Sequence, residues 1–367
     1  MSDPAERIEA ARRFYAEELR FVAHVETEDV IRAFASVPRE KFLGPGPWLV
    51  MGDDCTYWRT PDDDPAHVYH NVLLAIDAAR ELNNGHPQFW AGLLDKLGLR
   101  RGDTVYHVGA GTGYYTAIQA EIVGPEGRVT GVEIDPELAE RARANLADRM
   151  NVEIATADGS LHDPGPVDAL IVNAGATHPV PGWLAALKPH GRMLLPLTTD
   201  RNDGIVLRIE RMGEEAIYAA AVVSGVGIYP CAGARERNAE RALVRALGGG
   251  GRRFIRSLRV DPHIADGTCW LHGDGYCLSI NPPAASHRIL VAADKAPDPT
   301  APIKRLGRGN GPGGETTRPM PLQVEELSAG WPPLQHVGQR IRLGLACQDG
   351  DNRGRVDENH PSPLSSS

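Results

Sequence analysis

The stretch Thr104-Val-Tyr-His-Val-Gly-Ala-Gly-Thr-Gly-Tyr-Tyr-Thr116, continued by Arg128-Val-Thr-Gly-Val-Glu-Ile-Asp135, decides the fold. It predicts a buried strand over 105–108, a glycine turn, a helix over 114–123 and a second strand ending on acidic residues. This order is half of a nucleotide-binding βαβ unit. The glycines at 109, 111 and 113 let the backbone turn sharply, and N–H groups at the helix start would face an anionic ligand. Glu133 ends the second strand, where a carboxylate can accept both hydroxyls of a ribose.

The spacing of these glycines indicates which nucleotide the turn would hold. A dinucleotide-binding turn needs the pattern G-x-G-x-x-G, but Tyr114 stands where its last glycine should be, which argues against an NAD site. The pattern G-x-G-x-G is typical of methyltransferases that use S-adenosylmethionine, so we predict this cofactor. Asp158 is expected to accept the adenine amino group, and His107 to serve the amino acid end through water. The predicted cofactor-binding residues are His107, Gly109, Ala110, Gly111, Thr112, Gly113, Tyr114, Glu133, Ile134, Asp158, Gly159 and Asn173.

Strands alternate with helices along the middle of the chain. This alternation predicts an α/β fold with a doubly wound, Rossmann-like sheet of the S-adenosylmethionine-dependent methyltransferase type, preceded by N-terminal helices. The expected helices cover 5–21, 27–35, 114–123 and 136–147, and the expected strands 105–108, 128–135, 152–155, 167–173, 192–197, 205–209 and 216–223.

We divide the chain into four parts. A helical, substrate-side segment is predicted over 1–80, the methyltransferase core over 81–230, and a small C-terminal appendage over 231–282. The appendage is expected to carry a helix over 236–247 and a tight turn at Gly273-Asp274-Gly275. Residues 283–367 lack periodicity and are rich in Pro, Gly and Ser, a composition that predicts a disordered tail.

Composition argues against several classes of protein. The chain has 39 Lys and Arg against 48 Asp and Glu, and its net charge of −9 argues against nucleic acid as a partner. The N-terminus has no apolar core, and no apolar run is long enough to cross a bilayer. We therefore expect a cytoplasmic protein without a membrane partner.

The cysteine and histidine patterns predict no metal site. The five cysteines are scattered without C-x-x-C spacing, which favours free thiols over a disulfide framework or a zinc site. The acidic run Asp62-Asp-Asp64, followed by His67 and His70, is typical of a solvated loop and a helix start.

Several further motifs carry a family resemblance. A helical segment ends in Val37-Pro-Arg-x-x-Phe42, the glycine turn ends in Gly113-Tyr114, and Val226-Gly-Ile-Tyr-Pro230 follows the core. In these motifs, over roughly residues 12–235, the chain resembles protein-L-isoaspartate O-methyltransferases. The resemblance implies methyl transfer from S-adenosylmethionine to a carboxylate of a protein or peptide.

One motif departs from that family. Its members carry Gln-Thr-Ile-Ser-x-Pro before the first core strand, with hydroxyls that line the substrate carboxylate, but this chain has Leu82-Asn-Asn-Gly-His-Pro87. Asn83 takes the place of the threonine and Gly85 that of the serine. We predict that Asn83 and Asn84 supply amide donors to a carboxylate, and we include His86 among the catalytic residues.

The acceptor stays open at the level of sequence. A carboxylate is ionised at pH 7 and needs no general base, whereas an alcohol or a protonated amine does. His86, His70, His107 and His178 are the candidate bases for such an acceptor, and Asn173, Thr177 and His178 are expected at the mouth where acceptors enter. The alternatives are a related O- or N-methyltransferase acting on a modified peptide or a small molecule, and a non-catalytic protein that binds the cofactor.

Overall fold

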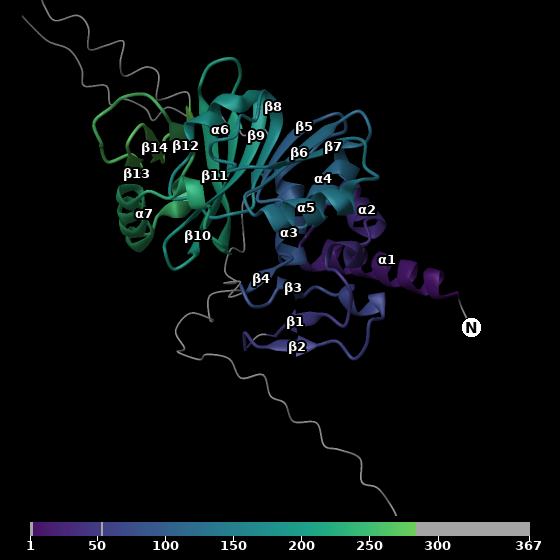
Figure 1. Cartoon of the computed structure of the whole chain (residues 1–367). Coiled ribbons are helices and arrows are strands. Elements are labelled where there is room, and N and C mark those ends of the chain that lie inside the picture. Colours follow the sequence, from purple (N-terminus) through teal and green to yellow (C-terminus); the bar gives the residue numbers. More distant parts are fainter. Residues whose placement is uncertain (1–2, 53, 284–367) are drawn as a thin grey trace, which may run out of the picture. The chain divides into compact units, whose positions relative to one another are not determined.

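The computed structural model describes residues 3–52 and 54–283 (Figure 1). The predicted disordered tail lies outside these residues, apart from residue 283. Among the described residues, no helix is both long enough and apolar enough to span a lipid bilayer.

A ten-stranded sheet runs through the chain in the order β13-β14-β12-β11-β10-β9-β8-β5-β6-β7. The pairs β7–β6, β6–β5, β5–β8 and β8–β9 are parallel, and the remaining pairs, from β9–β10 onward, are antiparallel. This arrangement confirms the predicted Rossmann-like α/β fold. The strands are β5 (Thr104–Val108), β6 (Arg128–Glu133), β7 (Val152–Thr156), β8 (Val167–Val172), β9 (Leu187–Thr198), β10 (Asp203–Arg211), β11 (Tyr218–Gly227), β12 (Ser257–Arg259), β13 (Cys269–Gly273) and β14 (Tyr276–Ser279).

The sheet is buried on both faces at its parallel end. Ala169 and Ile171 of β8 join one hydrophobic core, and Leu170 and Val172 join the other. Side chains alternate between the faces because the strand period is two residues. Near-continuous apolar runs such as 169–172 are what a doubly covered parallel sheet requires.

Helices cover both faces of this sheet. Residues of the first four α-helices share one core, and Trp183 and Leu243, from α6 and α7, belong to the other. The helices are α1 (Pro4–Val22), α2 (Glu28–Ser36), α3 (Pro87–Leu97), α4 (Tyr114–Val123), α5 (Pro136–Leu146), α6 (Pro181–Ala186) and α7 (Arg237–Gly249), with short 3₁₀ turns η1 (Arg39–Phe42), η2 (Pro65–Val68), η3 (Ala232–Ala234) and η4 (Arg252–Phe254).

A second, four-stranded sheet precedes α3. Its order is β2-β1-β3-β4, and all its pairs are antiparallel. The strands are β1 (Leu49–Met51), β2 (Tyr57–Arg59), β3 (Leu73–Asp77) and β4 (Leu82–Asn83). The helical character expected for residues 1–80 therefore holds for α1, α2 and the short turns, but not for this sheet, whose strands are too short for a clear alternating pattern.

The C-terminal appendage extends the main sheet. Strand β12 pairs with β11 through Tyr218 and Leu258, and β14 pairs with β12. The appendage therefore continues the antiparallel side of the sheet. The predicted turn at Gly273-Asp274-Gly275 is confirmed as the link between β13 and β14.

The cysteine prediction holds only in part. Cys231, Cys269 and Cys277 are free thiols. Cys55 is disulfide-bonded, so the prediction of free thiols is wrong at that position.

Candidate functional site

The glycine turn between β5 and α4 has the geometry that its spacing predicts. Gly109, Gly111 and Gly113 have φ angles of 79°, 56° and 95°, in the left-handed region that favours glycine. A Cβ atom at Gly113 would lie 2.7 Å from Leu146 Cδ1, whereas one at Gly111 would meet nothing within 4 Å. Gly111 therefore needs to be glycine for its backbone conformation, and Gly113 also for its packing.

Glu133 holds the turn through its carboxylate. Its Oε2 accepts a hydrogen bond from Gly111 N–H at 2.7 Å, and its Oε1 accepts one from Asp135 N–H at 3.0 Å. A carboxylate offers about four acceptor positions, so each oxygen can accept one further hydrogen bond. The next residue, Ile134, is 52% exposed and offers an apolar face beside the carboxylate. This pairing suits a ribose and the flat ring attached to it.

Asp158 lies beside a segment that follows β11. Its Oδ1 accepts hydrogen bonds from Ser160 N–H at 2.9 Å and Ser160 Oγ at 2.7 Å. A Cβ atom on Gly233 would lie 2.0 Å from Asp158 Oδ2, so the chain in η3 comes very close to this carboxylate. Gly159 is buried, and its carbonyl oxygen accepts a hydrogen bond from Trp183 Nε1 at 2.8 Å.

Three predicted cofactor residues, Tyr114, Thr112 and His107, are buried. The ring of Tyr114 packs against Phe42, with ring centroids 5.6 Å apart. Thr112 is buried, and its carbonyl oxygen accepts a hydrogen bond from the Asn145 amide. His107 is fully buried and its Nδ1 lies 2.9 Å from Thr116 Oγ1 of α4. Contact between these residues and a cofactor therefore stays a prediction. For Thr112 and Tyr114 we expect such contact through the backbone and not through the side chain.

Asn173 lies at the carboxyl end of β8, against the turn. Its side-chain amide donates to the carbonyl oxygen of Gly109 at 3.1 Å, and its own N–H donates to Val108 O at 2.8 Å. A Cβ atom on Gly109 would lie 3.1 Å from Asn173 O. The two strand ends are thus tied together at the edge where open α/β sheets bind ligands.

The segment that replaces the family's hydroxyl motif forms β4 and the start of α3. Asn83 accepts a hydrogen bond from the Tyr57 hydroxyl at 2.9 Å and donates to Glu81 O at 3.0 Å. Asn84 is buried, and its N–H donates to Leu74 O at 2.7 Å. The two amides therefore have different surroundings, with Asn83 half-buried and Asn84 inside the protein.

Arg39, from the Val-Pro-Arg motif, is fully buried beside Asn84. Its guanidinium donates to the backbone carbonyl oxygens of Val68, His70 and Val72 at 2.8 to 2.9 Å and to Asn84 Oδ1 at 3.4 Å. It also lies over the ring of Tyr114, 5.9 Å from the centroid. One buried cation thus joins the N-terminal segment, the Asn84 amide and the first residue of α4. In the sequence this motif indicates the family, but it does not predict a role for the arginine.

Gly85 connects this segment to the helix that follows the glycine turn. Its carbonyl oxygen accepts a hydrogen bond from the Tyr115 hydroxyl at 3.1 Å. Its φ is 81°, and a Cβ atom would lie 2.8 Å from Tyr115 Cε2 and 3.0 Å from Trp90 Nε1. The structure therefore leaves no room for the serine that the family carries at this position.

His86 precedes α3 and is largely buried. Burial, with the positive charge of Arg39, lowers the pKa of His86 to about 4. Its Nδ1 is buried without a hydrogen-bond partner among the described residues. His86 is therefore neutral at pH 7, but a base with so low a pKa is weak. Burial likewise lowers the pKa of His107 to about 3.

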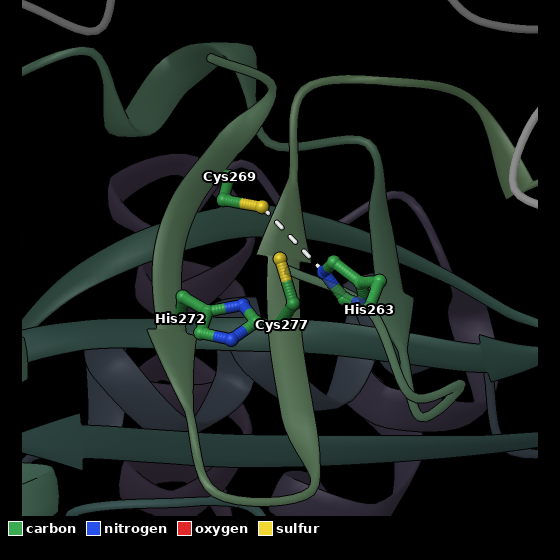
Figure 2. Close-up of side chains that lie close together, drawn as sticks. All are labelled: His263, Cys269, His272 and Cys277. Atoms are coloured by element: carbon green, nitrogen blue, oxygen red, sulfur yellow. Dashed lines mark hydrogen bonds between the residues drawn. The ribbon is translucent and has the colours of Figure 1, made fainter. Parts of the chain in front are cut away.

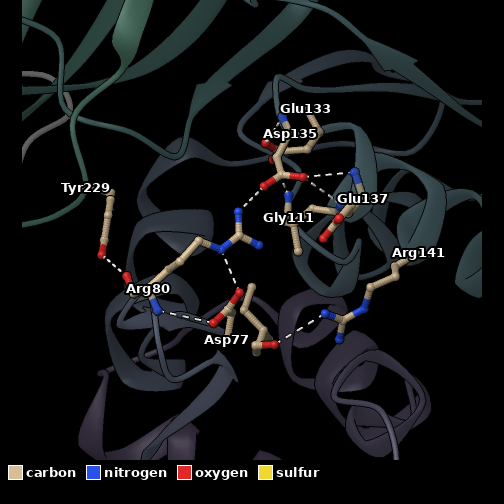
Figure 3. Close-up of polar contacts among 10 residues, drawn as sticks. Asp77, Arg80, Gly111, Glu133, Asp135, Glu137, Arg141 and Tyr229 are labelled. Atoms are coloured by element: carbon tan, nitrogen blue, oxygen red, sulfur yellow. Dashed lines mark hydrogen bonds and ion pairs between the residues drawn. The ribbon is translucent and has the colours of Figure 1, made fainter. Parts of the chain in front are cut away.

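A cluster of ion pairs, not expected from the sequence, lies beside Glu133 (Figure 3). Arg80, between β3 and β4, bonds Asp77 with an N–O distance of 2.6 Å and also pairs with Asp135. The hydroxyl of Tyr229 donates to the carbonyl oxygen of Arg80. Tyr229 belongs to the Val226–Pro230 motif, which was the one sequence signal for this contact.

The described part of the chain contains a cavity of about 780 Å³ away from the glycine turn. It lies among α6, α7 and the β13–β14 hairpin, and its lining includes His178, Glu236 and Tyr276. None of the predicted cofactor residues lines it. His178 Nε2 lies 3.5 Å from Glu236 Oε1, so this candidate base faces the cavity rather than the segment 83–86.

Comparison with known proteins identifies the chain's relatives. The family model for protein-L-isoaspartate(D-aspartate) O-methyltransferase (PCMT) matches residues 59–229. A protein-L-isoaspartate O-methyltransferase of Ignicoccus hospitalis is 33% identical over 195 residues, which cover 52% of this chain and 83% of the relative. Protein-L-isoaspartate O-methyltransferase 2 of Archaeoglobus fulgidus is 44% identical over 190 residues, 51% of this chain and 78% of the relative.

A solved structure shows the same fold. A protein-L-isoaspartate O-methyltransferase matches with a TM-score of 0.50 and 21% identity, covering 68% of this chain and 73% of that chain. Motifs, fold and relatives agree that the chain belongs to the protein-L-isoaspartate O-methyltransferase family of S-adenosylmethionine-dependent methyltransferases.

Proposed function

We propose that this enzyme transfers the methyl group of S-adenosylmethionine to a carboxylate of a protein or peptide, with isoaspartyl residues as the first acceptor class to test. The observation that carries the proposal is the contact between two segments. Gly85, in the segment that replaces the hydroxyl motif, is bonded to Tyr115 in the first turn of α4. An acceptor bound along 83–86 would therefore lie next to the glycine turn.

The residues at the turn fit the proposed cofactor. Glu133 is already oriented by Gly111 and Asp135, and Ile134 presents apolar surface beside it. In this proposal Glu133 accepts the ribose hydroxyls, Ile134 packs against the adenine, and Asp158 with Gly159 contacts the adenine edge. The backbone from Gly109 to Gly113, including Ala110, together with Asn173, surrounds the amino acid part.

The chemistry asks little of the protein beyond placement. When bound, S-adenosylmethionine supplies a methyl group on a sulfonium that is already an activated electrophile. A carboxylate with a pKa near 4 is already ionised, so no general base is needed. The protein must hold the carboxylate in line with the methyl group and keep water away. The low pKa of His86 agrees with a reaction that needs no base: His86 is too weak a base to deprotonate an acceptor, and an ionised carboxylate carries no proton that must be removed.

Asn83 and Asn84 have separate roles in this proposal. Asn83, half-buried in β4, supplies an amide donor to the acceptor carboxylate. Asn84 is buried and accepts a hydrogen bond from Arg39 through its Oδ1, so its NH₂ group is the end left to donate to an acceptor that reaches this position. Two amide donors then replace the hydroxyls of the family motif.

The test is methyl transfer from labelled S-adenosylmethionine to an isoaspartyl peptide and to its normal aspartyl twin, counting base-labile label. We expect label on the isoaspartyl peptide alone. Glu133→Gln removes a charged acceptor, so it should raise the KM for the cofactor roughly 10-fold or more. Glu137→Gln is the matched control. Glu137 is exposed in the first turn of α5, and its N–H donates to the carboxylate of Asp135, the neighbour of Glu133 (Figure 3).

Absence of label on both peptides, with cofactor binding intact by calorimetry, would contradict carboxylate methylation of this class. Asn83→Ala and Asn84→Ala should lower kcat/KM for the peptide and leave the cofactor KM unchanged. Loss of cofactor binding in these variants would instead place the amides in the cofactor site.

A further inference from the structure

Four potential metal ligands meet at the edge of the appendage (Figure 2). They are His263, Cys269, His272 and Cys277, and one ligand atom from each lies within 4.8 Å of the others. None of them belongs to the glycine turn or to segment 83–86. The sequence predicted no metal site because these residues lack C-x-x-C spacing.

The hairpin fixes three of the four ligands. Cys269 and His272 lie on β13, and Cys277 lies on β14. His272 and Cys277 stand directly opposite each other in the ladder. The fourth ligand, His263, comes from the loop between β12 and β13 and folds back toward Cys269, with Nε2 3.5 Å from Sγ. The backbone ladder thus positions most of the cluster before any ion binds.

His263 is held in the tautomer that a metal ligand needs. Its Nδ1 lies 2.8 Å from the carbonyl oxygen of Asp261. A carbonyl can only accept a hydrogen bond, so Nδ1 carries the proton and Nε2 keeps its lone pair for the cluster. A hydrogen bond from the other ring nitrogen to a carbonyl is the usual support for a metal-binding histidine.

Cys269 has support of the same kind. The backbone N–H of Asp266 points at its Sγ, 3.4 Å away, and such a donor stabilises a thiolate. Arg259 of β12 pairs with Cys277 in the ladder, and its guanidinium is bonded to Asp261 at 2.8 Å. The nearby cation is thus paired with a carboxylate, which reduces its repulsion of a metal ion.

We propose that His263, Cys269, His272 and Cys277 bind one Zn²⁺ ion, which fastens the loop after β12 to the β13–β14 hairpin. Two thiolates and two imidazoles are a soft donor set that suits tetrahedral zinc. Binding releases one proton from each thiol, so the filled site is electrically neutral. Zinc–sulfur distances of about 2.3 Å and zinc–nitrogen distances of about 2.0 Å place tetrahedral ligand atoms about 3.3 to 3.8 Å apart. The cluster, whose ligand atoms lie within 4.8 Å of one another, therefore needs to contract by at most about 1 to 1.5 Å.

A structural ion would be useful at this position. The appendage strands β12 and β14 are only three and four residues long, and they form the open antiparallel side of the sheet. Strand β12 joins β11 through two residue pairs only, so few backbone hydrogen bonds hold it to the sheet, and a structural zinc ion adds its binding free energy to folding. The ion would also fix His272 and Gly273, which line the 780 Å³ cavity.

The test uses the full chain, purified in reducing buffer, with metal content measured by mass spectrometry. We expect one zinc per chain. After removal of metal with a chelator, titration with Co²⁺ alone should produce the absorption band of cobalt bound to thiolate, and Zn²⁺ should abolish that band. Cys269→Ser, Cys277→Ser and His263→Asn should weaken binding by more than the roughly 10- to 100-fold typical of residues that only orient a ligand.

Two variants serve as matched controls. Cys231→Ser changes a free thiol outside the cluster, and His190→Asn changes an exposed histidine at φ 64°, a conformation that asparagine tolerates. Both should keep one zinc per chain. A wild-type protein without zinc or a cobalt–thiolate band, or with a Cys269–Cys277 disulfide instead, would overturn the proposal. Binding retained in all three ligand variants would also overturn it.

If the ligand variants fail to fold, the wild type still decides the question. Zinc should protect Cys269, which is half-buried, from alkylation, and removal of zinc should expose it. Equal alkylation of Cys269 with and without zinc would contradict the site. Neither readout depends on methyl transfer, so failure of the proposed function leaves this inference standing.

Discussion

Two arginines hold the small sheet β1–β4 in place, and they do so in opposite ways. Arg39 is fully buried, with three backbone carbonyls and the Asn84 amide as acceptors. Arg80 has a side chain that is 43% exposed, and it pairs with Asp77 and Asp135. Arg39 faces the segment 83–86, and Arg80 faces the strand end that carries Glu133.

The comparison teaches where polar contacts stabilise this fold. An exposed ion pair adds little stability, because both charged groups are well hydrated whether or not they are paired. A buried cation whose acceptors are backbone carbonyls cannot be removed without leaving those carbonyls unsatisfied. We therefore expect Arg39 to contribute mainly to the free energy of unfolding. We expect Arg80 to act mainly on the position of Asp135 and Glu133, where we propose that the cofactor binds.

The largest expected effect is that of Arg39→Met. It removes the donor to Val68 O, Val72 O and Asn84 Oδ1, whereas His70 O keeps the hydrogen bond from Val72 N–H. We therefore expect a loss of about 3 kcal/mol in the free energy of unfolding, measured by urea denaturation. Arg39→Lys should recover only part of this loss, because an ammonium group cannot match the planar fork of the guanidinium. A loss no larger than that of Arg80→Ala would break the comparison.

The second effect concerns pH. The pKa of His86 is lowered to about 4 and that of His107 to about 3, against about 6.5 in an unfolded chain. Stability is therefore complete above about pH 6.5 and is lost as pH falls, because only the unfolded chain takes up these protons. Each histidine should contribute a slope that grows from about 0.7 kcal/mol per pH unit at pH 6.5 toward about 1.4 near pH 5.5.

Replacing the histidine tests that assignment. His86→Asn should show a shallower loss of stability over this pH range, measured by urea denaturation at several pH values. His24→Asn is the control, because His24 is exposed and its φ of 53° suits asparagine. Equal slopes in the wild type and His86→Asn would mean that His86 is not held neutral by burial.

The third effect lies in the same buried region. Gly85→Ser restores the family's serine but places a Cβ atom 2.8 Å from Tyr115 at a positive φ, so we expect a loss of about 1 to 2 kcal/mol and no gain in methyl transfer. Gly182→Ser is the control, since a Cβ atom there meets nothing within 4 Å. Increased activity in Gly85→Ser would show that the segment can return to the family arrangement.

The smallest expected effect on stability is that of Arg80→Ala, at less than about 1 kcal/mol. Because Arg80 pairs with Asp135, which also bonds Glu133 through its N–H, the KM for S-adenosylmethionine should rise more than the stability falls. Arg13→Ala, which breaks the exposed pair with Glu9 in α1, should change neither. A stability loss as large as that of Arg39→Met would remove the distinction between the two arginines.

Much of the fold could be predicted from the sequence because its signals are local. The helix from Tyr114 to Val123 has the predicted bounds, and the strands on either side differ from the prediction by one or two residues. Burial on both faces makes these strands apolar throughout, and the turn between them requires glycines. Glu133 could be placed for the same reason, since it is the last residue of the predictable strand β6.

The sequence by itself determined the family, the α/β sheet and the position of the glycine turn, because each depends on neighbours in the chain. Tertiary structure alone decided the partners of Arg39 and Arg80, the space around Gly85 and the meeting of His263 with Cys277. These contacts join residues from separate elements, and their strength depends on burial, which no spacing along the chain records. The pairing of β12 with β11, which brings the four metal ligands to the sheet edge, is decided in the same way.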